Sequence, residues 1–380
     1  MASTAERRLN PFPWYECMRK QQPVAFDAQN QSWSVYGYDD VQRVLSDYEH
    51  FSSRFIGGGE QDPLDNSLIS TDPPRHNQLR ALVSQAFTPK AINQLAPRIE
   101  AIARELLDDV VDKGEADIVR DFAYPLPVTV IAELLGIPVA DRARFKRWSD
   151  AMVSSGTSAV DHGDIEREMG EYFVWSIEQH RQNPRNDLIS ALLAAELDGE
   201  RLSMRDLLGF GVLLLIAGNE TTTNLIGNAI LCFDEHPGTY DELRNDPSLL
   251  PGAIEEVLRF RSPVQSMFRV VVKDTQLGGQ EIKANQAAVA FIGSANRDET
   301  QFPLADQFEI HRRPNRHIAF GHGVHFCLGA PLARLEGRIG LEAILQRMPD
   351  LTRDLSVPLV PIESHVVYGV RNLPVRFRAV

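Results

Sequence analysis

Residues 320–329 (FGHGVHFCLG), called here the cysteine loop, combine one cysteine with three glycines and two histidines. Glycines at such spacing favour special backbone angles or close approach of the backbone to a flat ligand. Cys327 stands just before APLARLEGR, in which Pro331 suits the first turn of a helix. A thiolate at the start of a helix is stabilised by the helix dipole and by free backbone N–H groups. The segment therefore presents Cys327 as a nucleophile or a metal ligand.

Two chemistries compete with the ordinary role of a cysteine as a small buried hydrophobic residue. His325 is near enough in the chain to form a Cys–His nucleophile pair, as in a hydrolase. Alternatively, one thiolate suffices to bind haem iron, because the macrocycle supplies the other ligands. Cys17 and Cys232 lie far away and form no C-x-x-C pair, so neither a disulfide framework nor a zinc site is expected. Haem ligation explains a lone cysteine best.

A second candidate site lies in the stretch AGNETTTN, residues 217–224. It interrupts an apolar pattern that predicts a long buried helix over residues 203–237, with a capping box at Ser203 and Pro237 at its end. A buried carboxylate and hydroxyls cost free energy unless they are paired or hydrated. The stretch is either a satisfied polar cluster or a local opening of the helix. In the second case Glu220 would relay protons and Thr221 would hold water or an oxygen ligand.

The elements that must position these residues are mostly helical. β-rich parts are expected at about residues 23–37 and 264–293, because PVAF and SWSVY flank a polar turn and FRVVVKDTQLGGQEIKANQAAVAFIG is rich in strand formers. The remainder shows helical patterns, without repeats or low-complexity linkers. We expect one domain over residues 1–380, mainly α with a minor β portion.

Composition narrows the class of protein. The formal net charge of -13 argues against nucleic acid or an anionic membrane as the main partner. No apolar run at the N-terminus resembles a signal peptide or membrane anchor, and residues 207–218 form a run too short to span a bilayer. We therefore expect a cytoplasmic protein. We also expect it to be a monomer.

Taken together, the motifs resemble those of the cytochrome P450 monooxygenases, most of all the short, soluble prokaryotic type. The cysteine loop matches F-G-x-G-x-H-x-C-x-G, and residues 217–221 match A-G-x-[DE]-T. Glu256 and Arg259 match E-x-x-R, while DPPRHNQLRALVSQAF (residues 72–87) and RRPNRHIAFG resemble family segments in the same order. The resemblance implies a mainly helical fold with a long central helix over haem b.

The resemblance also implies roles for individual residues. Cys327 is the iron ligand, whose thiolate favours cleavage of the O–O bond. Glu220 and Thr221 are the acid–alcohol pair that delivers protons to dioxygen. Glu256, Arg259 and Arg312 form a buried structural network. The implied cofactor contacts are His76, Arg80, Ala217, Gly218, Arg269, Phe320, His325 and Gly329.

A substrate pocket is expected at Leu213, Val264, Met267, Val366 and Val367, with the loop IGGGEQ after Phe55 and the region near residues 150–175. These residues are mainly apolar, which indicates a small hydrophobic substrate.

The implied reaction is the insertion of one oxygen atom from dioxygen, usually as a hydroxyl. Electrons would come from NAD(P)H through a ferredoxin or flavodoxin with its reductase, and Arg334 and Arg338 would help to form a basic docking face. The alternatives are a peroxide-driven haem-thiolate oxygenase and a haem protein that senses a ligand without turnover.

Overall fold

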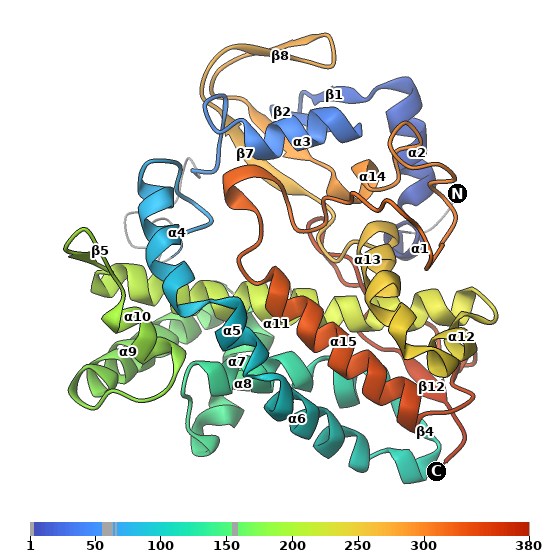
Figure 1. The fold of residues 1–380 in the computed structure, drawn as a ribbon. Helices are drawn as coiled ribbons and strands as arrows, with labels where there is room; N and C mark the ends of the chain where they lie inside the picture. The colour runs from blue at the N-terminus through green and yellow to red at the C-terminus, as the bar shows by residue number, and fades with distance from the viewer. Residues whose placement is uncertain (1–3, 55–63, 65–66, 154–158, 380) are drawn as a thin grey trace.

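The computed structural model describes residues 4–54, 64, 67–153 and 159–379. Helices dominate and strands form a smaller part, which confirms the predicted class of fold (Figure 1). The α-helices are α1 (Thr4–Leu9), α2 (Phe12–Gln21), α3 (Tyr38–Ser46), α4 (Arg75–Ala86), α5 (Pro89–Asn93), α6 (Ala96–Asp108), α7 (Pro125–Leu134), α8 (Arg142–Val153), α9 (Ala159–Gln182), α10 (Leu188–Ala194), α11 (Met204–Glu235), α12 (Thr239–Asn245), α13 (Leu250–Phe260), α14 (Ile292–Ala295) and α15 (Ala330–Arg347).

The principal sheet joins three strands from the N-terminal part of the chain with two from residues 267–290, in the order β1-β2-β10-β7-β3. β1 and β2 form the expected antiparallel hairpin, with Val24 opposite Val35, and β10 runs parallel to β2 and antiparallel to β7. The strands are β1 (Val24–Asp27), β2 (Ser32–Val35), β3 (Phe51–Ser52), β4 (Glu115–Asp117), β5 (Glu196–Leu197), β6 (Glu200–Arg201), β7 (Met267–Val271), β8 (Thr275–Leu277), β9 (Gln280–Ile282), β10 (Ala287–Ala290), β11 (Thr352–Arg353) and β12 (Pro374–Arg376).

Several short strands lie in segments expected to be helical. β3 pairs with β7, β4 pairs with β12, and β5 and β6 form a small hairpin. Two or three residues are too few to show a period-two pattern, which is why the sequence does not predict these strands.

The central helix is α11. The side chain of Ser203 accepts a hydrogen bond from the Asp206 N–H, and the Asp206 carboxylate accepts one from the Ser203 N–H at 2.9 Å, so the predicted capping box is present. The helix ends at Glu235, shortly before Pro237. It packs against α7, α13 and α15, and Figure 1 shows it crossing behind α15.

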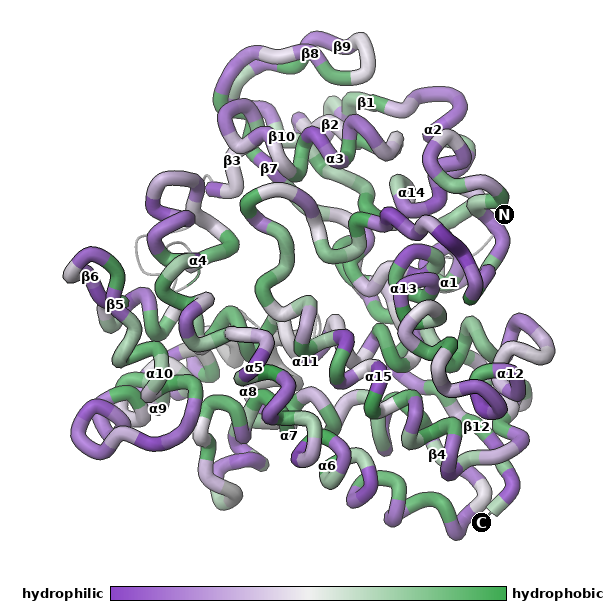
Figure 2. The backbone as a smooth tube through the Cα atoms, viewed as in Figure 1, coloured by the Kyte–Doolittle hydropathy of each residue, from purple (hydrophilic) through white to green (hydrophobic). Residues whose placement is uncertain are grey.

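Two hydrophobic cores flank the candidate site. The larger surrounds α11 with residues of α6, α7, α13 and α15, and the smaller lies between the five-stranded sheet, α3 and α14. Hydrophobic and hydrophilic stretches alternate along the helices (Figure 2), as expected for helices that bury one face. Over the ranges that the structure describes, every helix is too short or too polar to cross a lipid bilayer.

Candidate active site

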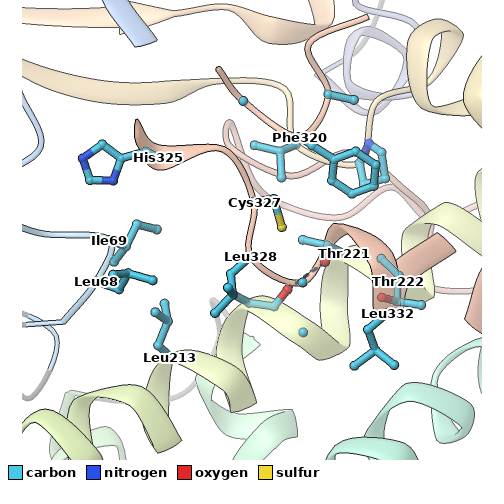
Figure 3. A pocket seen from close by; sticks show the side chains of 18 of the residues that line it. Leu68, Ile69, Leu213, Thr221, Thr222, Phe320, His325, Cys327, Leu328 and Leu332 are labelled. Atoms are coloured by element: carbon cyan, nitrogen blue, oxygen red, sulfur yellow. Dashed lines mark hydrogen bonds between the residues drawn. The ribbon is translucent and has the colours of Figure 1, made fainter. Parts of the chain in front are cut away.

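A cavity of about 270 Å³ lies between α11 and the cysteine loop. Figure 3 shows Cys327 in the middle of it, with His325 to one side and Leu213, Leu328 and Leu332 nearer α11. Its apolar wall includes Leu68, Ile69, Leu213, Val264, Met267 and Leu332. Mostly apolar cavities with a few convergent polar groups are the usual form of small-molecule sites.

The cysteine loop holds the thiol through its backbone. The Cys327 N–H donates to the Phe320 carbonyl oxygen at 2.9 Å. Gly321 and Gly323 have φ values of +75° and +71°, which residues with a side chain rarely adopt. A Cβ on Gly323 would also lie 2.8 Å from the Cβ of Ser46 in α3. Glycine is therefore required at these two positions, and the second seats the loop against α3.

Burial and the nearby polar groups have opposite effects on the pKa of the Cys327 thiol. Burial raises the pKa of the Cys327 thiol above its ordinary value. Hydrogen bonds from the N–H groups of Gly329 and Ala330, at the start of α15, act to lower it. The positive charges of Arg80 and Arg334 act in the same direction. A coordinated metal ion deprotonates a thiol outright, and these donors and charges would then stabilise the thiolate.

The polar stretch of α11 faces this sulfur without breaking the helix. The structure has continuous α-helix over Met204–Glu235, so the alternative of a local opening is wrong. The Thr221 hydroxyl donates to the Ala217 carbonyl oxygen at 2.7 Å, which satisfies the polar side chain inside the helix. Ala217, Gly218 and Thr221 all line the cavity. A Cβ on Gly218 would lie 2.3 Å from Cδ1 of Ile131, so close packing against α7 also accounts for this glycine.

Glu220 neighbours Thr221 but is not among the residues that line the cavity. Burial raises the pKa of its carboxyl to about 7, while the positive charge of Arg371 acts to lower it. The segment before Arg371 runs along α11, where Nδ2 of Asn228 donates to the Tyr368 carbonyl oxygen at 3.3 Å. The alcohol thus borders the cavity, and the acid lies toward the C-terminal segment.

Five basic side chains border the cavity: His76, Arg80, Arg269, His322 and His325. Arg269 is 4% exposed, and burial lowers its pKa to about 10. Within the described residues, neither Arg80 nor Arg269 forms an ion pair. Nε2 of His76 is buried without a hydrogen-bond partner.

Buried cations without counter-charges are costly unless an anion completes them. A flat, apolar cofactor with two carboxylates and a metal that accepts one thiolate would fill an apolar cavity, give the buried basic side chains anionic partners and bind the cysteine. The residues present therefore fit haem: Cys327 would bind the iron, and His76, Arg80, Arg269 and His325 would hold the propionates.

The structure brings Glu256, Arg259 and Arg312 together behind this site. Arg259 donates to both carboxylate oxygens of Glu256, and Nε of Arg312 lies 3.1 Å from each of them. The backbone N–H of Glu309 and Nδ2 of Asn315 complete the shell around Glu256. The network joins α13 to the segment that leads into the cysteine loop.

The remaining expected residues fall into two groups. Phe320, Gly329, Leu213, Val264 and Met267 line the cavity. Val366 and Val367 do not: Val366 is 48% exposed, and Val367 forms an isolated β-bridge with Val264. The loop IGGGEQ and residues 154–158 lie outside the described residues, and no described side chain of residues 150–175 lines the cavity.

Sequence reasoning missed several residues of the site. Leu68 and Ile69 line the cavity from the segment before the DPPRH motif, and Ile131 lines it from α7. Glu336 of α15 lines it too, is 2% exposed, and leaves Oε2 without a hydrogen-bond partner. The only sequence signal for Glu336 is that it is a charged residue on the buried face of the helix after Cys327.

Comparisons with known proteins agree with this geometry. The family model described as Cytochrome P450 matches residues 24–154 and 164–349. "Putative cytochrome P450 YjiB" of Bacillus subtilis (strain 168) is 47% identical over 376 residues, which is 97% of this chain and 94% of that protein. Erythromycin C-12 hydroxylase of Saccharopolyspora erythraea is 40% identical over 375 residues, 95% of this chain and 93% of that protein. The crystal structure of CYP109E1 from Bacillus megaterium in complex with corticosterone has a TM-score of 0.92 at 45% identity, covering 98% of this chain and 99% of that one.

A family model over most of the chain and a relative of this identity show that the chain belongs to the cytochrome P450 family. It is accordingly a haem-dependent monooxygenase, an oxidoreductase that uses oxygen.

Proposed function

We propose that the protein uses electrons from a partner protein to reduce dioxygen and inserts one oxygen atom, as a hydroxyl, into a small hydrophobic substrate. The observation that carries this proposal is the meeting, in one apolar cavity, of the Cys327 thiol with the Thr221 hydroxyl beside Glu220. Haem b bound through Cys327 would supply the redox chemistry. The second oxygen atom leaves as water, so each turnover consumes two electrons and two protons.

The chain's own residues handle these protons. The Thr221 hydroxyl donates a hydrogen bond to the Ala217 carbonyl oxygen. The lone pairs of the hydroxyl oxygen are then free to accept a hydrogen bond from water in the cavity. Glu220, with a pKa of about 7, is largely protonated below neutral pH and is matched to proton delivery. The apolar walls limit the water around the substrate, so the alcohol and the acid control where protons arrive.

Electrons would come from NAD(P)H through a reductase and a ferredoxin or flavodoxin. Phe326, next to the ligand Cys327, is 42% exposed, so the cysteine loop reaches the surface and offers a partner a short route. The structure weakens the expectation for a basic docking face. Arg334 donates to Glu255 at 2.7 and 2.8 Å, and Arg338 lies 3.6 Å from Glu342, so both charges are already matched.

The cavity favours a neutral apolar substrate. The part of its wall formed by Leu68, Ile69, Leu213, Val264 and Met267 offers no charged group for orientation. The related CYP109E1 was crystallised with corticosterone, so steroids are the first compounds to test on this chain.

Titration of the haem-loaded protein with steroids, terpenes, macrolides and fatty acids, followed by the Soret band, tests the proposal. A compound that shifts the band and is then hydroxylated with reductant and an electron carrier supports it. Leu213→Phe should weaken the shift because it narrows the cavity, whereas Val366→Phe, outside the cavity, should not. Oxidation of reductant without any product from the shifting compounds would contradict the proposal.

A further inference from the structure

One carboxylate, Asp72, faces basic side chains that border the cavity, although Asp72 itself does not line it. Asp72 is 8% exposed, and Oδ1 lies 3.9 Å from Nε2 of His325, an ion-pair distance that is too long for a hydrogen bond. Its charge also acts favourably on the buried Arg269. Arg54, which is mostly exposed, is 3.9 Å from Oδ2. Asp72 thus faces three basic groups from three different segments.

Hydrogen bonds keep this carboxylate ionised. The Ser52 hydroxyl donates to Oδ2, and the Ser53 N–H donates to Oδ1 at 3.0 Å. Burial alone would raise the pKa of Asp72, but the nearby His325 and the hydrogen bonds from Ser52 and Ser53 hold it below its usual range. The carboxylate therefore carries a fixed negative charge throughout the neutral pH range.

The same residues fix the His325 ring. Its Nε2 lies 3.0 Å from the Ser53 hydroxyl oxygen, and its centroid lies 4.3 Å from that of the His76 ring. Within the described residues Nδ1 forms no hydrogen bond, although His325 lines the cavity. A hydrogen bond to one ring nitrogen fixes the orientation of a histidine and thus the direction of its other nitrogen. Hydrogen-bond partners orient metal-binding histidines in the same way.

We propose that Asp72 is a positioning residue for the haem. Together with Ser53 it holds His325 so that Nδ1 can bind a propionate, and its fixed charge lowers the reduction potential of the iron. Charges and hydrogen bonds outside the ligand are established means by which proteins set haem potentials. The inference depends on haem binding but not on the proposed oxygen insertion, so it can be tested without a substrate.

The first test is the ferric–ferrous reduction potential of the haem-loaded Asp72→Asn variant. Asparagine keeps an acceptor for the Ser53 N–H but removes the negative charge. Loss of this charge favours the reduced, ferrous iron. We expect a shift to more positive potential on the order of a tenfold change in the reduction equilibrium, about 59 mV for one electron. The matched control is Asp187→Asn, because Asp187 also accepts a backbone N–H, at 2.9 Å, and pairs with a buried histidine, His180 at 2.8 Å, but His180, unlike His325, does not line the cavity.

An unchanged potential in Asp72→Asn, or an equal shift in Asp187→Asn, would overturn the proposal and leave Asp72 a folding role only. If Asp72→Asn does not retain haem, Ser53→Ala decides, because it removes the hydroxyl beside His325 and keeps the charge. We expect this variant to shift the propionate bending band in the resonance Raman spectrum. A band identical to that of the unmodified protein would refute the positioning role.

Discussion

Arg259 donates from Nε and Nη2 to the two carboxylate oxygens of Glu256, at 2.8 and 2.7 Å, and neither side chain is exposed. Nη1 of Arg259 also donates to the carbonyl oxygens of Asn296 and Ala305, at 3.0 and 2.8 Å. One side chain therefore ties α13 to two loops that lead toward the cysteine loop. A fully buried ion pair of this kind tolerates the loss of neither partner.

Arg259→Met should accordingly lower the free energy of unfolding by about 3–5 kcal/mol, because Glu256 is left buried with fewer donors. Urea denaturation of the haem-loaded protein measures the change. The control is Lys283→Met, which removes an exposed partner of Asp274 at 3.2 Å and should leave the unfolding midpoint nearly unchanged. Similar losses in the two variants would show that the buried network has no special structural role.

Gly323→Ala should reduce haem occupancy. A side chain at φ +71° costs about 1–2 kcal/mol by itself. The added Cβ would also meet the Cα of Ser46 at 2.9 Å, and backbone cannot yield easily, so the cysteine loop must shift. The ratio of Soret to protein absorbance reports the effect.

Gly279→Ala is the matched control for the loop. Gly279 has a φ of +78°, but a methyl group added there would meet no neighbouring atom within 4 Å, so the substitution adds backbone strain without a clash. Haem occupancy in this variant should stay near that of the unmodified protein. Equal haem loss in the two variants would mean that contact with α3 does not position the loop.

Glu220→Gln should slow dioxygen-driven turnover by about 10²-fold or more, because a positioned proton donor contributes on that scale. In the unmodified protein the dioxygen-driven rate should fall as the pH rises through about 7, where Glu220 loses its proton. Turnover with added peroxide, which arrives already reduced, should change much less. An equal loss with peroxide and with dioxygen would contradict the assigned role.

Glu336 should make stability depend on pH. Burial raises the pKa of its carboxyl to about 8 in the folded protein, from an ordinary value of 4.5. Between these values the folded state holds a proton that the unfolded state releases, so stability is greatest at low pH and falls as the pH rises toward 8. In Glu336→Gln the difference in the free energy of unfolding between low and high pH should be smaller by several kcal/mol, on the order of 1.36 kcal/mol for each pKa unit.

Urea unfolding at about pH 5 and about pH 9 measures the dependence. Glu342→Gln, on the same helix but with a partly exposed side chain, is the control and should keep the slope of the unmodified protein. A slope in Glu336→Gln as steep as in the unmodified protein would show that another group is responsible.

The sequence could predict those parts of the site that depend on local residue types. The positive φ angles of the cysteine loop require glycine, and the capping box at Ser203 marks the start of α11, so both are visible in a few neighbouring residues. The acid–alcohol pair stands out because polar residues interrupt an apolar helix. The sequence did not show what surrounds Glu220 and Thr221, nor that the helix continues unbroken through them; both follow from the structure.

Some contacts between distant segments were not predictable from the sequence. Asp72 meets His325 only because the segment before α4 lies against the cysteine loop, and the pairing of Arg334 with Glu255 depends on the packing of α15 on α13. Val366 illustrates the converse. Its carbonyl oxygen accepts the Gln265 N–H at 2.7 Å, and this backbone contact leaves the side chain exposed rather than in the cavity.

The most direct test of the central claim is turnover under ¹⁸O₂ with an electron carrier, its reductase and a compound that shifts the Soret band. We expect one labelled oxygen atom in each product molecule and loss of the activity in Cys327→Ala. Product that carries oxygen from water, or activity that survives without Cys327, would contradict it.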